Sequence, residues 1–149
     1  MGRKGFSLIE MMFVFVLAGV IMAIGFPRLR NSLEKQNIRS SKALIATLVA
    51  TARGAAISRG CPATLNMTND SVWVTACGLT GNPPPASVAV GTKKLVGEEF
   101  SVTLAPSTAS VVYDPRGIAT QFVARTVRVI GAHYTDSVVI NEVGKVTRQ

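Results

Sequence analysis

Residues 5–27 read GFSLIEMMFVFVLAGVIMAIGFP, and this stretch sets the architecture expected of the whole chain. Glu10 is its only charged residue. At about 1.5 Å per residue, a helix from Phe6 to Phe26 spans about 30 Å, which matches the hydrocarbon core of a bilayer. The stretch therefore predicts a helix that is apolar on all sides and able to cross a membrane.

The residues before this run, MGRKG at 1–5, are short and positive. Positive charge ahead of an apolar run predicts that the N-terminus stays in the cytoplasm and that the rest is exported. An ordinary secretory signal peptide is the competing interpretation, and it would have a shorter apolar region followed by a small-residue cleavage site. Here the run is long and breaks at Pro27, so we expect a membrane helix rather than a cleaved signal.

The segment 28–59 predicts a second, amphipathic half of the same helix, bent at Pro27 because proline lacks an N–H. Apolar and small residues recur at three- and four-residue steps, which is the pattern of one helix face. Gly60 and Pro62 mark its end. The face expected in the core carries Leu33, Asn37, Ser41, Leu44, Ile45, Leu48, Val49, Ala52, Ala55 and Ala56; the opposite face carries Glu34, Lys35, Arg39, Lys42 and Arg53.

Residues 60–149 have the composition of a β-rich domain, with short β-branched runs separated by turn residues. We therefore expect an α+β fold: a long N-terminal helix whose back half packs on an antiparallel sheet or on two small sheets. The segment 78–86 contains three consecutive prolines and is expected to be a loop. The expected strands are Ala63–Met67, Ser71–Ala76, Glu99–Leu104, Ser110–Tyr113, Phe122–Val129 and Ser137–Val143, with Lys93 and Lys94 in a loop and Trp73, Tyr113, Phe122 and Tyr134 packed in the core or on the sheets.

A carboxylate inside a membrane helix is costly unless it is neutralised or paired, so Glu10 is a functional residue by expectation. Cleavage after Gly5 would create a positive amine on Phe6, four residues before Glu10. In an array of parallel helices, the amine of one subunit could meet Glu10 of a neighbour and set the axial register. The alternative is an uncleaved signal anchor with an incidental glutamate.

The run Gly5-Phe6-Ser7-Leu8-Ile9-Glu10, the basic leader and Pro27 closely resemble the class III signal of type IV pilins and type II secretion pseudopilins. The resemblance implies removal of residues 1–5 by the prepilin peptidase, N-methylation of Phe6, and an assembly role for Glu10. It also implies an assembly helix over residues 6–27 and other pilins or pseudopilins as partners. The expected location is the bacterial inner membrane, with the C-terminal domain in the periplasm and later in a filament or at the cell surface.

A looser resemblance extends to most of the chain, with residues 78–98 unmatched. Residues 48–62, Trp73, the stretch 112–117 and the closing residues 138–146 are similar to the H-type pseudopilin and FimT-like minor pilin group. Two functions compete within that group. One is a minor pilin of a type IV pilus that primes assembly or binds DNA during uptake; the other is a pseudopilin at the tip of a type II secretion filament that contacts secreted proteins.

DNA-binding members of the FimT-like group carry a C-terminal motif close to Gly-Arg-x-Arg, and this chain ends Gly144-Lys145-Val146-Thr147-Arg148-Gln149. The resemblance makes Lys145 and Arg148 candidate DNA contacts, although on one strand they would point to opposite faces. The chain carries +8, which favours anionic partners or simply keeps a surface solvated. Further candidates are Arg116, Arg125 and Arg128, of which the last two would also lie on opposite strand faces.

Cys61 and Cys77, together with the export-type segment, suggest an oxidising compartment and one disulfide, with two unpaired thiols as the alternative. Two cysteines and the single His133 make a poor metal site, and no cofactor is expected. The acidic residues show no nucleophile–base spacing and no phosphate-binding glycine loop, so we expect no enzyme activity. Adhesion through the proline loop is a third possibility, for which the residues select no ligand.

Overall fold

The computed structural model describes residues 7–78 and 87–148. Gly5, Phe6 and most of the expected proline loop lie outside the described residues. The chain divides into two compact units at Leu33 and Glu34. We call the first unit the front segment and the second unit, from Glu34 onward, the head. The long helix α1, Leu8–Arg59, contributes to both units and runs without interruption through Pro27; the bend expected there stays a prediction.

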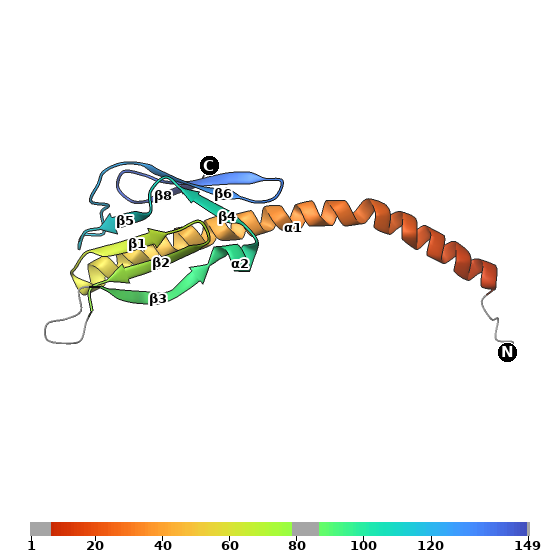
Figure 1. Ribbon diagram of the computed structural model, residues 1–149, viewed down its shortest axis with the longest axis horizontal. Coiled ribbons are helices and arrows are strands. Elements are labelled where there is room, and N and C mark those ends of the chain that lie inside the picture. Colours follow the sequence, from red (N-terminus) through yellow and green to blue (C-terminus); the bar gives the residue numbers. More distant parts are fainter. Residues whose placement is uncertain (1–6, 79–86, 149) are drawn as a thin grey trace. The chain divides into compact units, whose positions relative to one another are not determined.

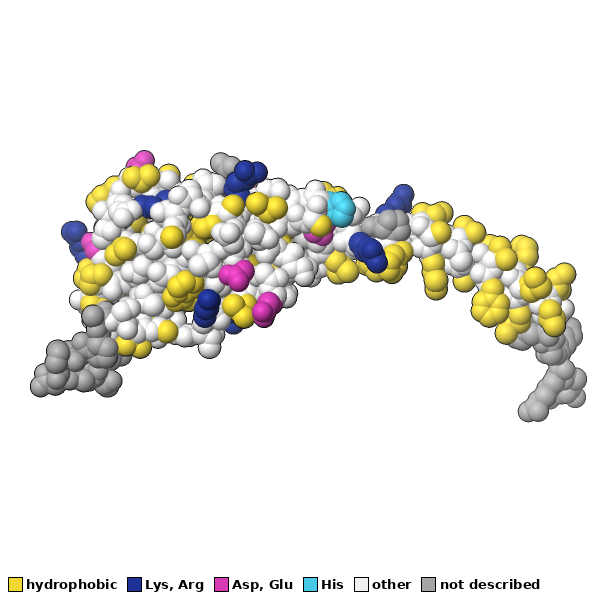
Figure 2. All heavy atoms as spheres, viewed as in Figure 1, with side chains coloured by type: hydrophobic (Ala, Val, Ile, Leu, Met, Phe, Trp, Pro, Cys, Tyr) yellow, Lys and Arg dark blue, Asp and Glu magenta, His cyan; other side chains and the backbone are white. Residues whose placement is uncertain are grey.

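The front segment is the first part of α1, and its apolar side chains are exposed. Leu8 is 80% exposed and Phe15 is 73% exposed, and large apolar residues of this kind continue to Leu33. Figure 2 shows these side chains covering the visible face of the front segment. This stretch is long and apolar enough to cross a membrane, with a mean hydropathy of 2.5. Exposure of these apolar side chains to water is thermodynamically unfavourable.

The head consists of the second part of α1 and two four-stranded antiparallel sheets (Figure 1). The first sheet has the order β3-β2-β1-β5, and the second has the order β4-β6-β7-β8. This confirms the α+β fold with two small sheets. The strands are β1 Ala63–Met67, β2 Ser71–Ala76, β3 Val88–Leu95, β4 Thr103–Pro106, β5 Ser110–Tyr113, β6 Arg125–Ile130, β7 Thr135–Ile140 and β8 Val146–Arg148; a short helix, α2 Val96–Phe100, precedes β4.

The core of the head lies between α1 and the inner faces of the sheets. Strand β1 alternates strictly, with Ala63, Leu65 and Met67 buried, as a strand with one face on a core must. From α1, Ile45 and Ala52 are completely buried. The helical stripe predicted from the sequence is therefore confirmed for these positions, whereas the expectation that Leu33 belongs to it was wrong, since Leu33 is 52% exposed. Lys42, which was expected on the outer face, is only 7% exposed; its partner is described below.

The segment between β2 and β4 differs from the expectation. Lys93 and Lys94 are not in a loop but in β3, which pairs antiparallel with β2 and shifts register between Val72 and Val74. The expected strand 99–104 is wrong in its first half, because Glu99 belongs to α2. That helix ends where Ser101 adopts a left-handed conformation with a φ of 53°. The chain then turns into β4, where Leu104 N–H donates to the carbonyl of Asn69.

The last two expected strands are each displaced. Strand β6 begins at Arg125, so Phe122 lies before it, with a φ of 43° and 64% of its surface exposed. The expectation that Phe122 packs in the core or on a sheet was wrong. Strand β7 ends at Ile140, and residues 141–145 form a turn into β8. Tyr113, in contrast, is completely buried as expected.

A disulfide joins Cys61 and Cys77 across a sequence separation of 16 residues. It connects the second residue after the end of α1 to the first residue after the end of β2. Arg59 Nη1 also donates a hydrogen bond of 2.7 Å to the carbonyl of Cys77. The disulfide and this hydrogen bond thus connect the end of α1 to the end of β2. The alternative of two unpaired thiols is wrong for this structure.

Candidate functional site

The first candidate position, Glu10, lies in the first turn of α1 and is exposed. Its N–H donates to the carbonyl of Ser7 at 3.1 Å, so the helix begins just before it. The surrounding front segment is apolar and exposed, which leaves the carboxylate on a surface that would become dry inside a helix bundle or a bilayer. Phe6, whose amine was predicted to pair with a neighbouring Glu10, lies outside the described residues.

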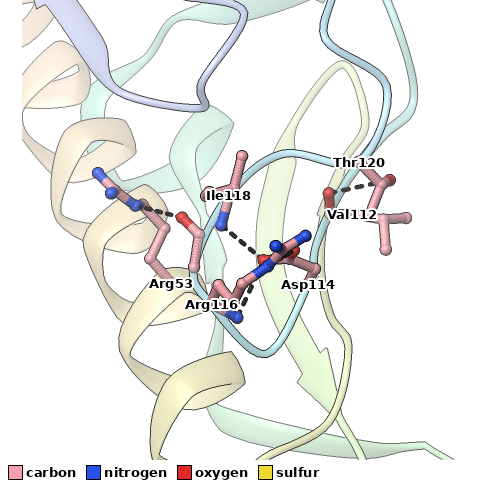
Figure 3. Close-up of polar contacts among 7 residues, drawn as sticks. Arg53, Val112, Asp114, Arg116, Ile118 and Thr120 are labelled. Atoms are coloured by element: carbon pink, nitrogen blue, oxygen red, sulfur yellow. Dashed lines mark hydrogen bonds and ion pairs between the residues drawn. The ribbon is translucent and has the colours of Figure 1, made fainter.

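The second candidate position is a turn that follows β5. Asp114 Oδ1 accepts hydrogen bonds from the N–H groups of Arg116, at 3.0 Å, and Ile118, at 2.9 Å (Figure 3). These contacts, with the Arg116 guanidinium at 3.0 Å from Oδ2, hold the pKa of the Asp114 carboxyl below its ordinary value. Asp114 is therefore the turn-forming residue predicted from the sequence. Arg116 projects from this turn, with 81% of its side chain exposed.

The same turn is fixed to α1. Arg53 Nε donates to the carbonyl of Gly117 at 2.9 Å, and Figure 3 shows this arginine reaching from the helix toward the turn. Gly117 has a φ of 78°, and a Cβ there would lie 2.8 Å from Cδ1 of Ile57. The backbone conformation favours glycine here, whereas the exposed end of the Ile57 side chain could move aside. Arg116 consequently stands on a rigid support.

A second turn, between β7 and β8, carries Lys145. The turn is closed by hydrogen bonds between Asn141 and Lys145, including Asn141 Oδ1 with the Lys145 N–H at 2.6 Å. Gly144 has a φ of 83° and occupies the position that favours glycine. Lys145 is exposed and lies in this turn, just before β8. The expectation that Lys145 and Arg148 point to opposite faces of one strand therefore does not apply.

Tyr113 joins the two turns. Its hydroxyl donates to the carbonyl of Gly144 at 3.3 Å, and burial raises its pKa to about 12, so the hydroxyl remains a donor throughout the neutral range. The N–H of Ala119, just after the first turn, donates to the carbonyl of Val143 in the second. Arg116 and Lys145 are therefore carried by two turns packed against one buried tyrosine.

The remaining basic candidates are arranged differently. Arg125 donates to Thr108 Oγ1 at 2.6 Å and to Gln121 Oε1, so its guanidinium is engaged within the head. Arg128 lies on the opposite, exposed face of β6, as predicted, and pairs in register with Ser137. Arg148 is in β8, paired with Val138. The five predicted residues thus do not form one stripe, and the structure brings together two of their turns.

Two polar contacts of α1 were missed by the sequence analysis. Lys42 Nζ lies 2.6 Å from Asp136 Oδ2 on β7. Glu34 accepts hydrogen bonds from the N–H groups of His133 and Tyr134, at 2.6 and 3.0 Å. Because the partners are 94 to 100 residues apart in the chain, no local pattern could have indicated them.

The carboxylates of Glu34 and Asp136 accept hydrogen bonds that connect α1 to the second sheet and its turn, and the carboxylate of Asp114 closes its own turn. Within residues 7–78 and 87–148, no group of three or more His, Cys, Asp or Glu residues could hold a metal ion. Chemically, the described sites offer an isolated carboxylate on an apolar helix and cations on rigid turns. Such groups suit non-covalent binding.

Comparison with protein families gives two matches. A family profile described as "Type II transport protein GspH" matches residues 43–144. A second profile, described as "Prokaryotic N-terminal methylation motif", matches residues 1–26. Each match falls within one unit of the chain: the methylation motif covers the apolar part of the front segment, and the other profile covers most of the head. A search of curated proteins found no match.

The fold is similar to that of the type IV minor pilin FimU of Pseudomonas aeruginosa strain PAO1, in two crystal forms. The P21 form has a TM-score of 0.60 at 12% identity, over 78% of this chain and 90% of that chain. The P65 form has a TM-score of 0.55 at 13% identity, over 74% of this chain and 91% of that chain. At this level of identity the likeness establishes the fold.

Proposed function

This chain belongs to the GspH family of type II transport proteins, and from that premise we propose that it is cut after Gly5 and assembled through its front segment into a membrane-rooted filament. The filament is a type IV pilus or a type II secretion filament, in which the chain is a minor pilin or pseudopilin. The observation that carries the assembly proposal is a single carboxylate, Glu10, in the apolar and exposed stretch 8–26 of α1.

The front segment determines the mechanism of assembly. Before assembly its apolar surface is covered by lipid, and in the filament it is covered by equivalent helices. Cleavage leaves a free amine on Phe6, which is then methylated and which meets Glu10 of a neighbouring subunit. In a medium of low dielectric this ion pair is strong, and an unpaired Glu10 is costly. The pairing therefore sets the axial register of each incoming subunit.

The orientation follows from the charges that flank the apolar run. Arg3 and Lys4 precede it, so the N-terminus is cytoplasmic and the head lies in the periplasm. This placement agrees with the Cys61–Cys77 disulfide, because the periplasm is oxidising. After assembly the head moves with the filament toward the cell surface.

Glu10→Ala tests the assembly proposal. We expect normal synthesis and membrane insertion, because the apolar run becomes more hydrophobic, but at least a tenfold loss of incorporation, since a lost buried pair costs more than about 1.4 kcal/mol. The measurement is the amount of the protein in sheared filaments relative to membranes. Glu98→Ala, which removes an exposed acid from the head, is the matched control. Incorporation of Glu10→Ala at the level of this control would contradict the register mechanism.

A second function is favoured by the two basic turns. We propose that Arg116 and Lys145, on the turns packed against Tyr113, contact the phosphates of DNA during uptake. Contacts between exposed cations and phosphates give affinity that is independent of sequence and sensitive to salt, which suits the capture of arbitrary DNA. Arg148 extends the same C-terminal motif, whereas the engaged Arg125 acts by holding the head together and Arg128 lies on a separate face.

Retention of duplex DNA by the wild-type head, measured across a salt titration, tests this function. We expect Lys145→Ala/Arg148→Ala to reduce the slope of log affinity against log salt by about two, and Arg116→Ala by about one. Lys93→Ala/Lys94→Ala removes the same charge from β3 and should leave the slope nearly unchanged. If the wild type retains no DNA at low salt, the alternative holds: a pseudopilin at the tip of a secretion filament that contacts secreted proteins or other pseudopilins.

A further inference from the structure

Residues 121–124, which we call the Phe122 segment, expose two neighbouring apolar side chains just before β6. Phe122 is 64% exposed and Val123 is 58% exposed. Phe122 also has a φ of 43°, in the left-handed region that bulky residues rarely adopt. Backbone strain of this kind persists where the surrounding structure enforces it, and it is common at binding sites. Because Phe122 is mostly exposed, packing inside the head does not offset this strain.

Hydrogen bonds on both sides fix the backbone of this segment. Before it, the N–H of Thr120 donates to the carbonyl of Val112 at 3.0 Å, and the Thr120 hydroxyl donates to the same oxygen at 3.3 Å (Figure 3). At its other end, the Arg125 guanidinium donates to Gln121 Oε1 and to Thr108 Oγ1. The strained residue is therefore presented by a fixed segment and not by a free loop.

The Phe122 segment is also attached to the support of the two basic turns. Ala119 forms a β-bridge with Tyr113, and its N–H donates to the carbonyl of Val143 at 3.4 Å. Burial raises the pKa of the Tyr113 hydroxyl, and the nearby charge of Arg125 opposes that rise. Tyr113 thus lies beside both basic turns and beside the residue that fixes the end of the Phe122 segment.

These connections limit the distance between Phe122 and the cations. Three residue steps lead from Ala119 to Phe122 and two from Val143 to Lys145, and they span at most about 11 Å and about 7 Å. With the hydrogen bond between Ala119 and Val143, the backbones of Phe122 and Lys145 lie within roughly 25 Å of one another. Each strand of B-form DNA carries a phosphate about every 3.4 Å, so about seven nucleotides cover this distance.

An exposed phenylalanine near exposed cations matches the two chemical parts of a nucleotide. Arg116 and Lys145 are exposed and suit the phosphates. An aromatic side chain stacks on the face of a base, and proteins that bind single strands combine such stacking with basic residues. A base inside a duplex is already stacked on its neighbours. The aromatic ring therefore selects unpaired bases, such as those of a single-stranded tail.

We propose that Phe122 stacks on an unpaired base and makes this site prefer DNA with a single-stranded tail over fully paired DNA. The inference rests on the DNA binding proposed above, and it specifies which form of DNA that site takes. Arg116 and Lys145 supply the affinity for phosphates, and Phe122 supplies the recognition of a base. The fixed backbone of the segment reduces the conformational entropy that is lost on binding.

The test measures binding of the full chain, in nonionic detergent micelles, to a duplex of about 20 base pairs with a tail of about eight nucleotides. One tail carries thymine bases, and the other has the same phosphates on abasic sugars. We expect the wild type to bind the thymine tail at least about fivefold more tightly, because of the stacked base. Phe122→Ala should abolish this preference and leave binding of the blunt duplex unchanged, whereas Phe122→Tyr should retain the preference.

Val123→Ala is the matched control, because it removes the neighbouring exposed apolar side chain and should retain the preference for the thymine tail. Arg116→Ala should weaken binding of both tails by the same factor, because it removes a phosphate contact. Phe122→Ala should unfold at the same denaturant concentration as the wild type, which shows that its loss of preference is not a loss of folding. An undiminished preference in Phe122→Ala would overturn the inference.

Failure of this inference and failure of DNA binding give different results. If the wild type binds the blunt duplex and binds both tails equally, the basic turns contact phosphates and the role of Phe122 in recognition is refuted. If the wild type retains none of the three DNA molecules at low salt, DNA binding itself is contradicted, and the inference fails with it. The exposed apolar side chains would then be left to a protein partner.

Discussion

Gly144 is the residue on which the geometry of the C-terminal basic turn depends most directly. Its φ is 83°, and a Cβ built there would lie 2.4 Å from Cε1 of Tyr113 and 3.1 Å from the Cβ of Ala119. Tyr113 cannot move away, because it is completely buried and its hydroxyl donates to the carbonyl of Gly144. Glycine at this position is therefore a condition for placing Lys145.

Gly144→Ala should destabilise the head by about 2–4 kcal/mol, since it adds backbone strain to an overpacked contact. The free energy of unfolding in denaturant measures this effect. Gly54→Ala is the matched control, because Gly54 is in α1 and a Cβ there would meet no atom within 4 Å. That variant should gain about 0.5–1 kcal/mol from helix propensity. Equal effects of the two changes would refute the packing role of Gly144.

Lys42 and Asp136 connect the helix to the second sheet, and their exposures are unequal. The side chain of Lys42 is 9% exposed, whereas that of Asp136 is 41% exposed. Loss of the carboxylate weakens the neutralisation of a buried ammonium, whereas loss of the ammonium leaves a carboxylate that water can solvate. We therefore expect Asp136→Asn to cost about 1–2 kcal/mol and Lys42→Met to cost less, in denaturant unfolding.

The same pair has a defined pH dependence. The hydrogen bond from Lys42 is the largest cause that lowers the pKa of Asp136 in the folded state. The stabilisation from this ion pair is then fully present above the unfolded pKa of Asp136, about 3.9. It is lost as the pH falls through the lower pKa that Asp136 has in the folded state. Asp136→Asn should flatten the fall in stability over that acidic range. An unchanged slope would show that the ion pair does not contribute.

At the scale of elements, the sequence predicts best what is encoded by neighbouring residues. The back half of α1 was found because Ile45, Leu48 and Ala52 repeat at helical spacing and are buried. Strands β1 and β2 were predicted with the bounds that the structure has, because their short β-branched runs are bounded by turn residues. The Asp114 turn was found for a related reason, since aspartate before proline forms its own hydrogen bonds to the backbone.

Elements that depend on distant partners were missed. Strand β3 is mostly exposed and lies at the edge of its sheet, so its sequence shows little of the alternation that marks a half-buried strand. Helix α2 is five residues long and ends at a left-handed Ser101, which no periodicity reveals. The candidate site shows the same limit: the sequence named Arg116 and Lys145, but only the fold brings their turns together on Tyr113.

On the scale of the whole molecule, the buried core belongs to the head. Among the described residues, the buried hydrophobic cluster begins at Ile38 and includes no residue of the front segment. The front segment instead leaves its large apolar side chains exposed. The head should therefore be stable without the front segment. The chain should become soluble in water only when the front segment is removed.

Two truncated chains test this division. A chain that begins at Arg28 keeps every buried residue, so we expect it to be soluble and to unfold in one cooperative transition in denaturant. A chain that begins at Ala46 loses Ile38, Lys42 and Ile45, of which Ile45 is completely buried. Because removing one large core side chain costs about 2–5 kcal/mol and a domain is stable by about 5–15 kcal/mol, the second chain should fail to fold. Amide hydrogen exchange of β6 and β7 measures folding in both truncated chains. Similar protection in the two would mean that residues 34–45 of α1 contribute little to the head. Protection in the chain from Arg28 that is lower than in the full chain would mean that the front segment stabilises the head.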